Sequence, residues 1–253
     1  MMWLWLMGCA ENCDREISDA GIQWAGLCAG AFWMGSDKGP EQQQPRHLVQ
    51  VPNFHIARSE TTVGQYEACV QAGACRAAAA QEGLPELCSY GREELLPMTC
   101  VNHEMATSFC QWAAARLPSE AEWEFAARSR GKANLYPWGK ESPSCELAAV
   151  SDDDCMPEGV LPVCTKPKGN TEQGLCDLAG NAFEWVADNY HSGYDETPVD
   201  GSPDPRPSNW MSMRGGGFNS DVKLATRTRT FHEPDFFYSG LGFRCARSGA
   251  GED

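Results

Sequence analysis

Two segments in the N-terminal third of the chain resemble strands, GAFWMGS (30–36) and HLVQVPNFHIA (47–57), and hydrophobic and polar residues alternate in the second. In the second segment Val49 and Val51 fall on one side, and Gln50 between them falls on the other. Because successive side chains of a strand point to opposite faces, this period of two predicts a strand in the second segment, and we expect a strand in the apolar first segment as well.

A spacing of three and four residues between apolar positions follows these strands. Val63, Tyr66 and Val70 have this spacing, which is typical of one face of a helix. Thr61 or Thr62, directly before them, has the side chain of an N-cap. The pattern therefore predicts a helix that begins after one of these threonines.

Two further helices are predicted in the middle of the chain. The first has an apolar stripe that faces a core; its residues are Val101, Met105, Phe109 and Trp112. Pro118 interrupts the chain, and Ser119 and Glu122 then form the capping box of the next helix.

The segment from residue 130 to residue 247 has little periodicity and is rich in glycine, proline and tryptophan. The whole chain contains 25 glycines and 16 prolines among 253 residues. A domain with this much irregular backbone needs additional stabilisation from disulfides or metal ions. We therefore expect a loop-rich C-terminal half.

The charge of the chain narrows the range of partners. Its formal net charge is −15 and its pI is about 4.7. An acidic surface repels phosphate backbones, so we expect no nucleic-acid partner. No apolar run beyond the N-terminal one is long enough to span a membrane, so a membrane contact is expected only through a lipid anchor.

Thirteen cysteines is a high number for this length. None lies in a C-x-x-C pair or beside a histidine at zinc-finger spacing, which favours disulfides in an oxidising compartment over a structural zinc site. The run MMWLWLMGC resembles a bacterial lipoprotein signal that lacks the usual basic start. It predicts a signal over residues 1–9 with lipid on Cys9, and a tether over residues 10–28. Secretion without lipid and a buried N-terminal strand are the alternatives.

An acidic segment, CDLAGNAFEWVADNYH (176–191), is the strongest candidate site. It places Asp177, Gly180, Asn181 and Glu184 within eight residues. Calcium takes about six to eight oxygen ligands, and two carboxylates neutralise its charge. The residue types alone leave an alternative equally open, in which Asp177 caps a turn and Glu184 pairs with an arginine.

Several motifs occur in the order and spacing of one known family. They are MGS (34–36), PRHLVQVPNFHIARSETTVGQYEACV (45–70), RLPSEAEWEFAAR (116–128), YPWG (136–139), GLCDLAGNAFEWVAD (174–188), MRGGGFNS (213–220) and LGFRCAR (241–247). With these motifs the chain resembles the sulfatase-modifying-factor, or formylglycine-generating-enzyme, family. The resemblance implies one loop-rich α+β domain related to C-type lectins, which we place at residues 29–249.

The resemblance also implies two stabilising features. One is a disulfide between Cys110 and Cys245. The other is a calcium site with two side-chain and two main-chain ligands: Asp177 and Glu184 by carboxylate, and Gly180 and Ala182 by carbonyl oxygen.

Enzymes of this family bind Cu(I) through two cysteines after an arginine–glycine segment, and the copper activates oxygen to oxidise a substrate cysteine. Alignment places Ser220 and Ala225 at those two positions, and no cysteine lies between Cys176 and Cys245. Because Cu(I) needs soft thiolate ligands, we expect neither this copper chemistry nor a catalytic residue here.

Two arginines, Arg227 and Arg229, match basic positions of the family. They either line a ligand cleft, where each binds a carboxylate bidentately, or pair with acids of the core. We favour the pairing with core acids.

These observations favour an extracytoplasmic, non-catalytic binding module that is held together by calcium and disulfides. Its ligand is expected to be a peptide, a protein or a glycan, and its place the bacterial envelope, as a lipoprotein, or the medium, as a secreted protein. Two alternatives stay open: an oxidoreductase of the same family with a different metal centre, and an accessory factor in sulfatase maturation.

Overall fold

The structure is a computed structural model that describes residues 17–19, 21–78, 88–151, 157–220 and 226–249. Cys9, with the predicted signal and lipid, and Ala225 lie outside the described residues. The described chain forms three small sheets and three α-helices joined by long loops, so the predicted loop-rich α+β class is confirmed. No helix in these described ranges has the length and apolar character that a membrane span requires.

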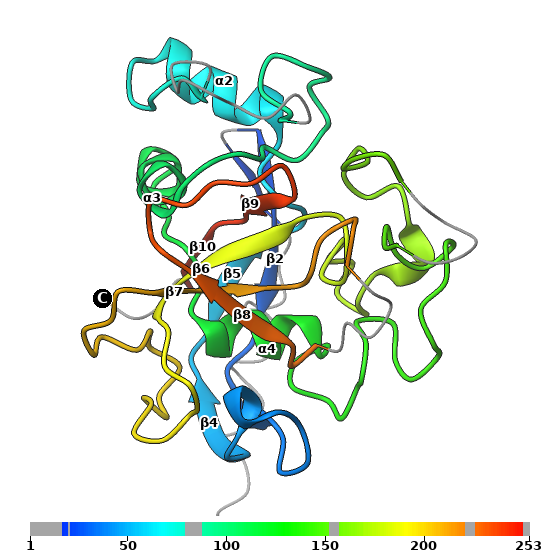
Figure 1. Cartoon of the computed structure of the whole chain (residues 1–253), viewed down its shortest axis with the longest axis vertical. Coiled ribbons are helices and arrows are strands. Elements are labelled where there is room, and N and C mark those ends of the chain that lie inside the picture. Colours follow the sequence, from blue (N-terminus) through cyan, green and yellow to red (C-terminus); the bar gives the residue numbers. More distant parts are fainter. Residues whose placement is uncertain (1–16, 20, 79–87, 152–156, 221–225, 250–253) are drawn as a thin grey trace, which may run out of the picture.

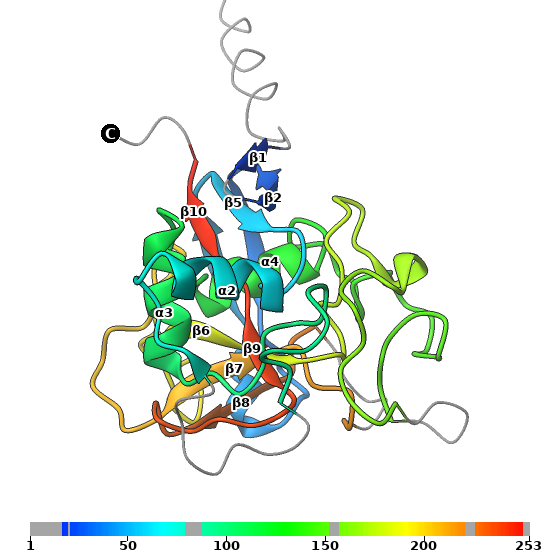
Figure 2. The ribbon, with the colours of Figure 1, turned by 90° about the horizontal axis from the view of Figure 1, so that it is seen from above.

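The first sheet joins strands from both ends of the described chain (Figure 2). Its antiparallel order is β1 (Ile17–Asp19), β2 (Ile22–Leu27), β5 (Phe54–Ala57) and β10 (Ala246–Ser248). The predicted tether over residues 10–28 is therefore wrong where β1 and β2 lie. Trp24 and Leu27 of β2 are buried, because this strand is apolar apart from the exposed Gln23 and packs into the core.

The second sheet contains two strands that the sequence pattern predicts, although their pairing was not predicted. It pairs β3 (Gly30–Met34) with β4 (His47–Val51) in antiparallel register. Phe32 and Val49 oppose each other on the buried side, whereas Trp33 and Leu48 oppose each other on the outer side, where they are 48% and 45% exposed. The two faces of the strands are therefore those that the period of two predicts.

The third sheet lies in the segment that has little periodicity. Its order is β8 (Arg229–His232), β7 (Met211–Arg214), β6 (Phe183–Asn189) and β9 (Leu241–Phe243). β6 and β9 are parallel, and the other neighbours are antiparallel. Most residues of β6, β7 and β9 are buried on both faces, so their sequences do not alternate.

Two of the three helices begin at predicted caps, and the third begins at a cap that was not predicted from the sequence. α2 (Val63–Gln71) is capped by Thr62, α3 (His103–Trp112) by Asn102, and α4 (Glu120–Ala127) by Ser119. The predicted capping box of Ser119 with Glu122 is confirmed. All eight residues of α4 are buried, because this helix contacts β3 and β4 on one side and β6 and β7 on the other.

The chain between α4 and β6 forms a lobe of loops beside the sheets, green to yellow in Figure 1. Apart from the short 3-10 helix η3 (Pro167–Gly169), its described part has no helix or strand. A second 3-10 helix, η1 (Glu41–Gln43), lies between β3 and β4.

Disulfides connect these elements. Cys110 of α3 is bonded to Cys245 between β9 and β10, the pair implied by the family resemblance. The others are Cys69–Cys75, Cys88–Cys100 and Cys164–Cys176, and Cys28 and Cys145 are disulfide-bonded as well. All ten cysteines of the described part are therefore oxidised, which is typical of proteins outside the cytoplasm.

Candidate metal site and charged core

The acidic segment forms a tight turn that leads into β6. Asp177, Gly180 and Asn181 have positive φ angles of 57°, 90° and 61°. Glycine is required at position 180, because a Cβ atom there would lie 2.4 Å from the carbonyl oxygen of Ala149. The N–H of Asn181 donates to that same oxygen, which holds the turn against the loop before it.

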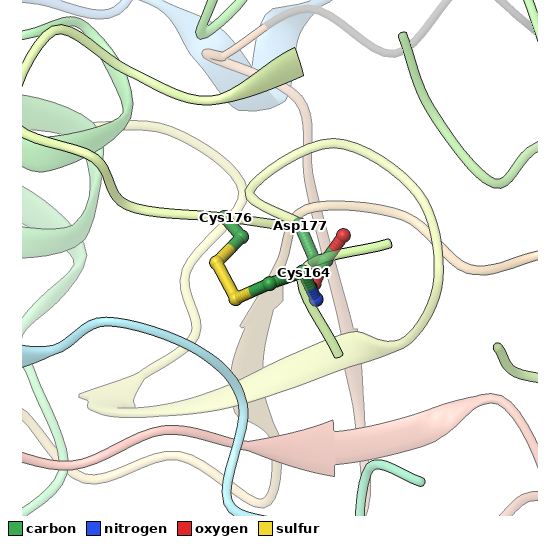
Figure 3. Close-up of side chains that lie close together, drawn as sticks. All are labelled: Cys164, Cys176 and Asp177. Carbon is green, nitrogen blue, oxygen red and sulfur yellow. A yellow bond between two sulfur atoms is a disulfide. The ribbon is translucent and has the colours of Figure 1, made fainter. Parts of the chain in front are cut away.

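A disulfide lies directly beside Asp177 (Figure 3). It joins Cys164 to Cys176, and the N–H of Cys164 donates to Oδ2 of Asp177 at 2.6 Å. One carboxylate oxygen and the two sulfur atoms lie within 4.8 Å of one another, a spacing that also suits a metal site. Only thiolate sulfur binds metal well, so the bonded sulfurs are not ligands, and the disulfide instead holds Asp177 in place.

Glu184 is fully buried on β6 and is the partner of Arg244, which is also fully buried. Nε of Arg244 donates to Oε2 of Glu184 at 2.7 Å, and Nη2 donates to Oε1 at 2.8 Å. Nε1 of Trp123 also donates to Oε2, at 2.8 Å. Both carboxylate oxygens of Glu184 are therefore occupied, as in the alternative in which this acid pairs with an arginine.

A third acid, Glu60, joins this cluster from the loop that follows β5. Nδ2 of Asn181 donates to Oε1 of Glu60 at 3.0 Å, and Oε2 has no hydrogen-bond partner among the described residues. Glu60 was not predicted from the sequence, because nothing in the segment around it suggests a ligand and it lies 121 residues before Asn181. Only the fold brings it to the acidic turn.

The cluster carries more negative than positive charge. It contains the carboxylates of Glu60, Asp177 and Glu184 and the guanidinium of Arg244, which gives a formal charge of −2 when all are ionised. Burial raises the pKa of Glu60 well above its usual range, and the charge of Asp177 adds to this effect. Burial also raises the pKa of Asp177, although the N–H of Cys164 opposes the shift. A proton or a divalent cation would relieve this buried charge.

The position at which the family enzymes carry their copper cysteines is a hydrogen-bonded turn. The N–H of Gly217 donates to Oγ of Ser220 at 2.9 Å, and the N–H of Ser220 donates to the carbonyl oxygen of Gly217 at 2.8 Å. A hydroxyl group is a hard ligand and does not suit Cu(I). Ala225, the second of these positions, lies outside the described residues.

The two arginines of the predicted cleft have different surroundings. Arg229 is buried, and its Nε and Nη2 donate to the two carboxylate oxygens of Glu120. A neighbouring buried pair joins Arg214 to Glu124 at 2.6 Å. Arg227 is half-buried, forms no ion pair with the described residues, and lines an open cavity. The structure thus places Arg229 among core acids and separates Arg227 from them.

The family model for the sulfatase-modifying factor enzyme 1-like domain matches residues 23–249. The chain is 36% identical over 168 residues to the inactive C-alpha-formylglycine-generating enzyme 2 of Bos taurus, which covers 63% of this chain and 53% of that protein. It is 34% identical to the same protein of Mus musculus, of which it covers 51%. The chain thus spans about half the length of these curated relatives.

Solved structures share the fold over nearly the whole chain. PvdO from Pseudomonas aeruginosa has a TM-score of 0.81 and 25% identity, with 94% of this chain and 100% of that chain covered. Variable protein 1 of Treponema denticola has a TM-score of 0.73 and 20% identity, with 92% and 98% covered. The second likeness concerns the fold alone.

Proposed function

The chain belongs to the sulfatase-modifying factor enzyme 1-like domain family, and from this premise we propose that it is a non-catalytic binding module that acts outside the cytoplasm and is stabilised by calcium. Its ligand is a peptide, a protein or a glycan. The family predicted from the sequence motifs is confirmed, whereas the binding role and the calcium are proposals.

The state of the cysteines carries the non-catalytic part of the proposal. Every cysteine of the described ranges is in a disulfide, and the sequence has none between Cys176 and Cys245. The family's copper position holds Ser220 instead. Cu(I) chemistry on a substrate thiol requires a thiolate pair at that place. The similarity to the inactive C-alpha-formylglycine-generating enzyme 2 is consistent with this interpretation.

The test is a conversion assay on a cysteine-containing peptide taken from a sulfatase. Purified protein is incubated with this peptide, Cu(I) and oxygen, and a family enzyme that has both copper cysteines serves as the positive control. We expect no formylglycine aldehyde by mass spectrometry above the no-protein background. Turnover of the peptide would overturn the non-catalytic assignment.

The charged cluster supports the calcium part of the proposal. Calcium prefers carboxylate and carbonyl oxygens, and a divalent ion would balance the formal charge of −2 that the three acids and Arg244 leave. Asp177 and Glu60 are the acids best placed to bind, since Oε2 of Glu60 has no partner among the described residues. Gly180 and Ala182 would add carbonyl oxygens. Glu184 would contribute its charge while it stays paired with Arg244.

Removal of Asp177 is expected to abolish stabilisation by calcium. A ligand that binds only the folded state stabilises it by about 2.7 kcal/mol at a hundredfold excess over Kd, which is roughly 5–10 °C in Tm for a chain of this size. Scanning calorimetry of EGTA-treated protein should give this increase when calcium is added. Asp177→Ala and Glu60→Gln should each lose it, whereas replacement of the exposed Asp235 by alanine should keep it. An unchanged shift in Asp177→Ala would disprove the assignment.

The location of the protein and the identity of its metal are part of the same proposal. Secretion, with or without lipid on Cys9, would bring the chain to the oxidising compartment that its disulfides indicate. Metal analysis of the purified protein separates the proposal from its enzymatic alternative: calcium alone supports the module, and stoichiometric iron or copper would favour an oxidoreductase. Capture of a sulfatase from an envelope extract would favour the accessory factor.

A further inference from the structure

A cavity of about 530 Å³ opens between the loop that follows β3 and the end of α4. This volume lies in the usual range of small-molecule sites, roughly 300–1,000 Å³. The lining residues are Gly35, Ser36, Asp37, Lys38, Gly39, Gln43, Arg46, Arg128, Ala133, Asn134 and Arg227. None of them belongs to the acidic cluster around Asp177, so this is a separate place in the fold.

The lining is rich in positive charge. It contains Lys38, Arg46, Arg128 and Arg227 but only one acid, Asp37. The chain as a whole has 35 acidic residues against 20 lysines and arginines, so a local excess of cations runs against its composition. Uncompensated cations around a concave surface raise the local concentration of anions.

One of the four cations already has an acidic partner, which it shares with Arg214. Nη1 of Arg128 donates to Oε1 of Glu124 at 3.0 Å and to the carbonyl oxygen of Trp33 at 2.6 Å. The side chains of Lys38, Arg46 and Arg227 form no ion pair with any described residue. With Asp37 subtracted from these three, the lining keeps a formal charge of +2.

The loop that carries Lys38 is held in place by hydrogen bonds. Oγ of Ser36 accepts the N–H groups of Lys38 and Gly39, and the N–H of Ser36 donates to the carbonyl oxygen of Gln43. A Cβ atom on Gly35 would lie 2.5 Å from that same oxygen, so the loop is closely packed there. A site whose backbone is already ordered loses less entropy on binding.

The two arginines are positioned as well. The guanidinium of Arg46 lies 4.7 Å from the ring centroid of Trp33, where a cation–π contact orients it. For Arg227, the backbone that carries the side chain is fixed, because Arg214 donates to the carbonyl oxygens of Thr226 and Arg227.

We propose that this cavity binds a doubly charged oxyanion, a phosphate group carried by the ligand, through Arg227, Arg46 and Lys38. The inference rests on the proposed binding role and names a ligand group for it. Arginine forks match the oxygens of phosphate bidentately, and lysine adds a point charge. A phosphate monoester carries nearly two negative charges at neutral pH, which balances the +2 of the lining, whereas a carboxylate or a sulfate ester carries one.

Isothermal titration calorimetry on the purified protein, in buffer without added calcium, tests the proposal. The titrants are inorganic phosphate, glucose 6-phosphate and acetate, at equal ionic strength and about pH 8, where phosphate is doubly charged because its second pKa is about 6. We expect saturable binding of both phosphates and none of acetate. Tighter binding of glucose 6-phosphate would identify an organic phosphate as the ligand, and equal binding would identify the free ion.

Three variants assign the binding to the cavity. Arg227→Gln and Lys38→Gln should each weaken phosphate binding about tenfold or more. Lys168→Gln removes the same charge from an exposed pair with Glu146 and should leave the affinity unchanged. Absence of saturable binding by the intact protein, equal affinity in Arg227→Gln, or an equal loss in Lys168→Gln would overturn the inference. The calcium shift and the peptide assay would then still decide the proposed function independently.

Discussion

Replacement of Glu184 by glutamine is expected to destabilise the fold by about 3–5 kcal/mol, because it leaves the guanidinium of Arg244 without its charged partner in the core. Both side chains are 0% exposed, and the pair is joined by two hydrogen bonds of 2.7 and 2.8 Å. Urea unfolding of the EGTA-treated protein measures the change apart from any effect of calcium.

A double-mutant cycle separates the pair from its surroundings. Arg244→Met alone should also be strongly destabilising, since it leaves three acids without their cation. The double variant Glu184→Leu and Arg244→Met should be less destabilised than the sum of the two single changes. Removal of the exposed pair Lys168–Glu146 is the control and should have no measurable effect. Additive losses in the cycle would mean that the two buried residues act independently.

Glu184 also shows how far the sequence determines the site. Its position after a glycine turn identified an acid of structural or metal-binding importance, and the residue types alone left both roles open. What decides between them is Arg244, which lies 60 residues later and reaches Glu184 because β9 runs parallel to β6. Glu60 lies far earlier in the sequence, in a loop with no ligand motif. Contacts between residues so far apart in the sequence depend on the fold, and no short sequence motif predicts them.

The same difference between local and distant signals holds for the fold. The start of α4 was predicted to the residue, because a capping box is formed by four consecutive residues. The strands β3 and β4 were predicted, and β4 shows why: one of its faces is exposed and the other is buried, so its residues alternate; the pairing of the two strands had no signal in the sequence. Strands β6, β7 and β9 were missed because their neighbours cover both faces, which removes the alternation.

Removal of the disulfide between Cys110 and Cys245 is expected to cost about 5 kcal/mol on the chain-entropy model, because it closes a loop of 135 residues. The bond joins α3 to the segment between β9 and β10, so the unfolded chain without it gains freedom over half its length. The double replacement Cys110→Ala and Cys245→Ala leaves no free thiol, and urea unfolding gives the free energy.

The short disulfide between Cys69 and Cys75 provides the matched comparison. The four cysteines of the two disulfides differ little in burial, since Cys69, Cys110 and Cys245 are 0% exposed and Cys75 is 8% exposed. The cavities left by alanine are therefore similar, and the difference between the two double variants reports loop length. The loop of six residues should be worth only about 2 kcal/mol. Equal losses in the two variants would mean that packing of the sulfur atoms, and not the restriction of the unfolded chain, is what these bonds contribute.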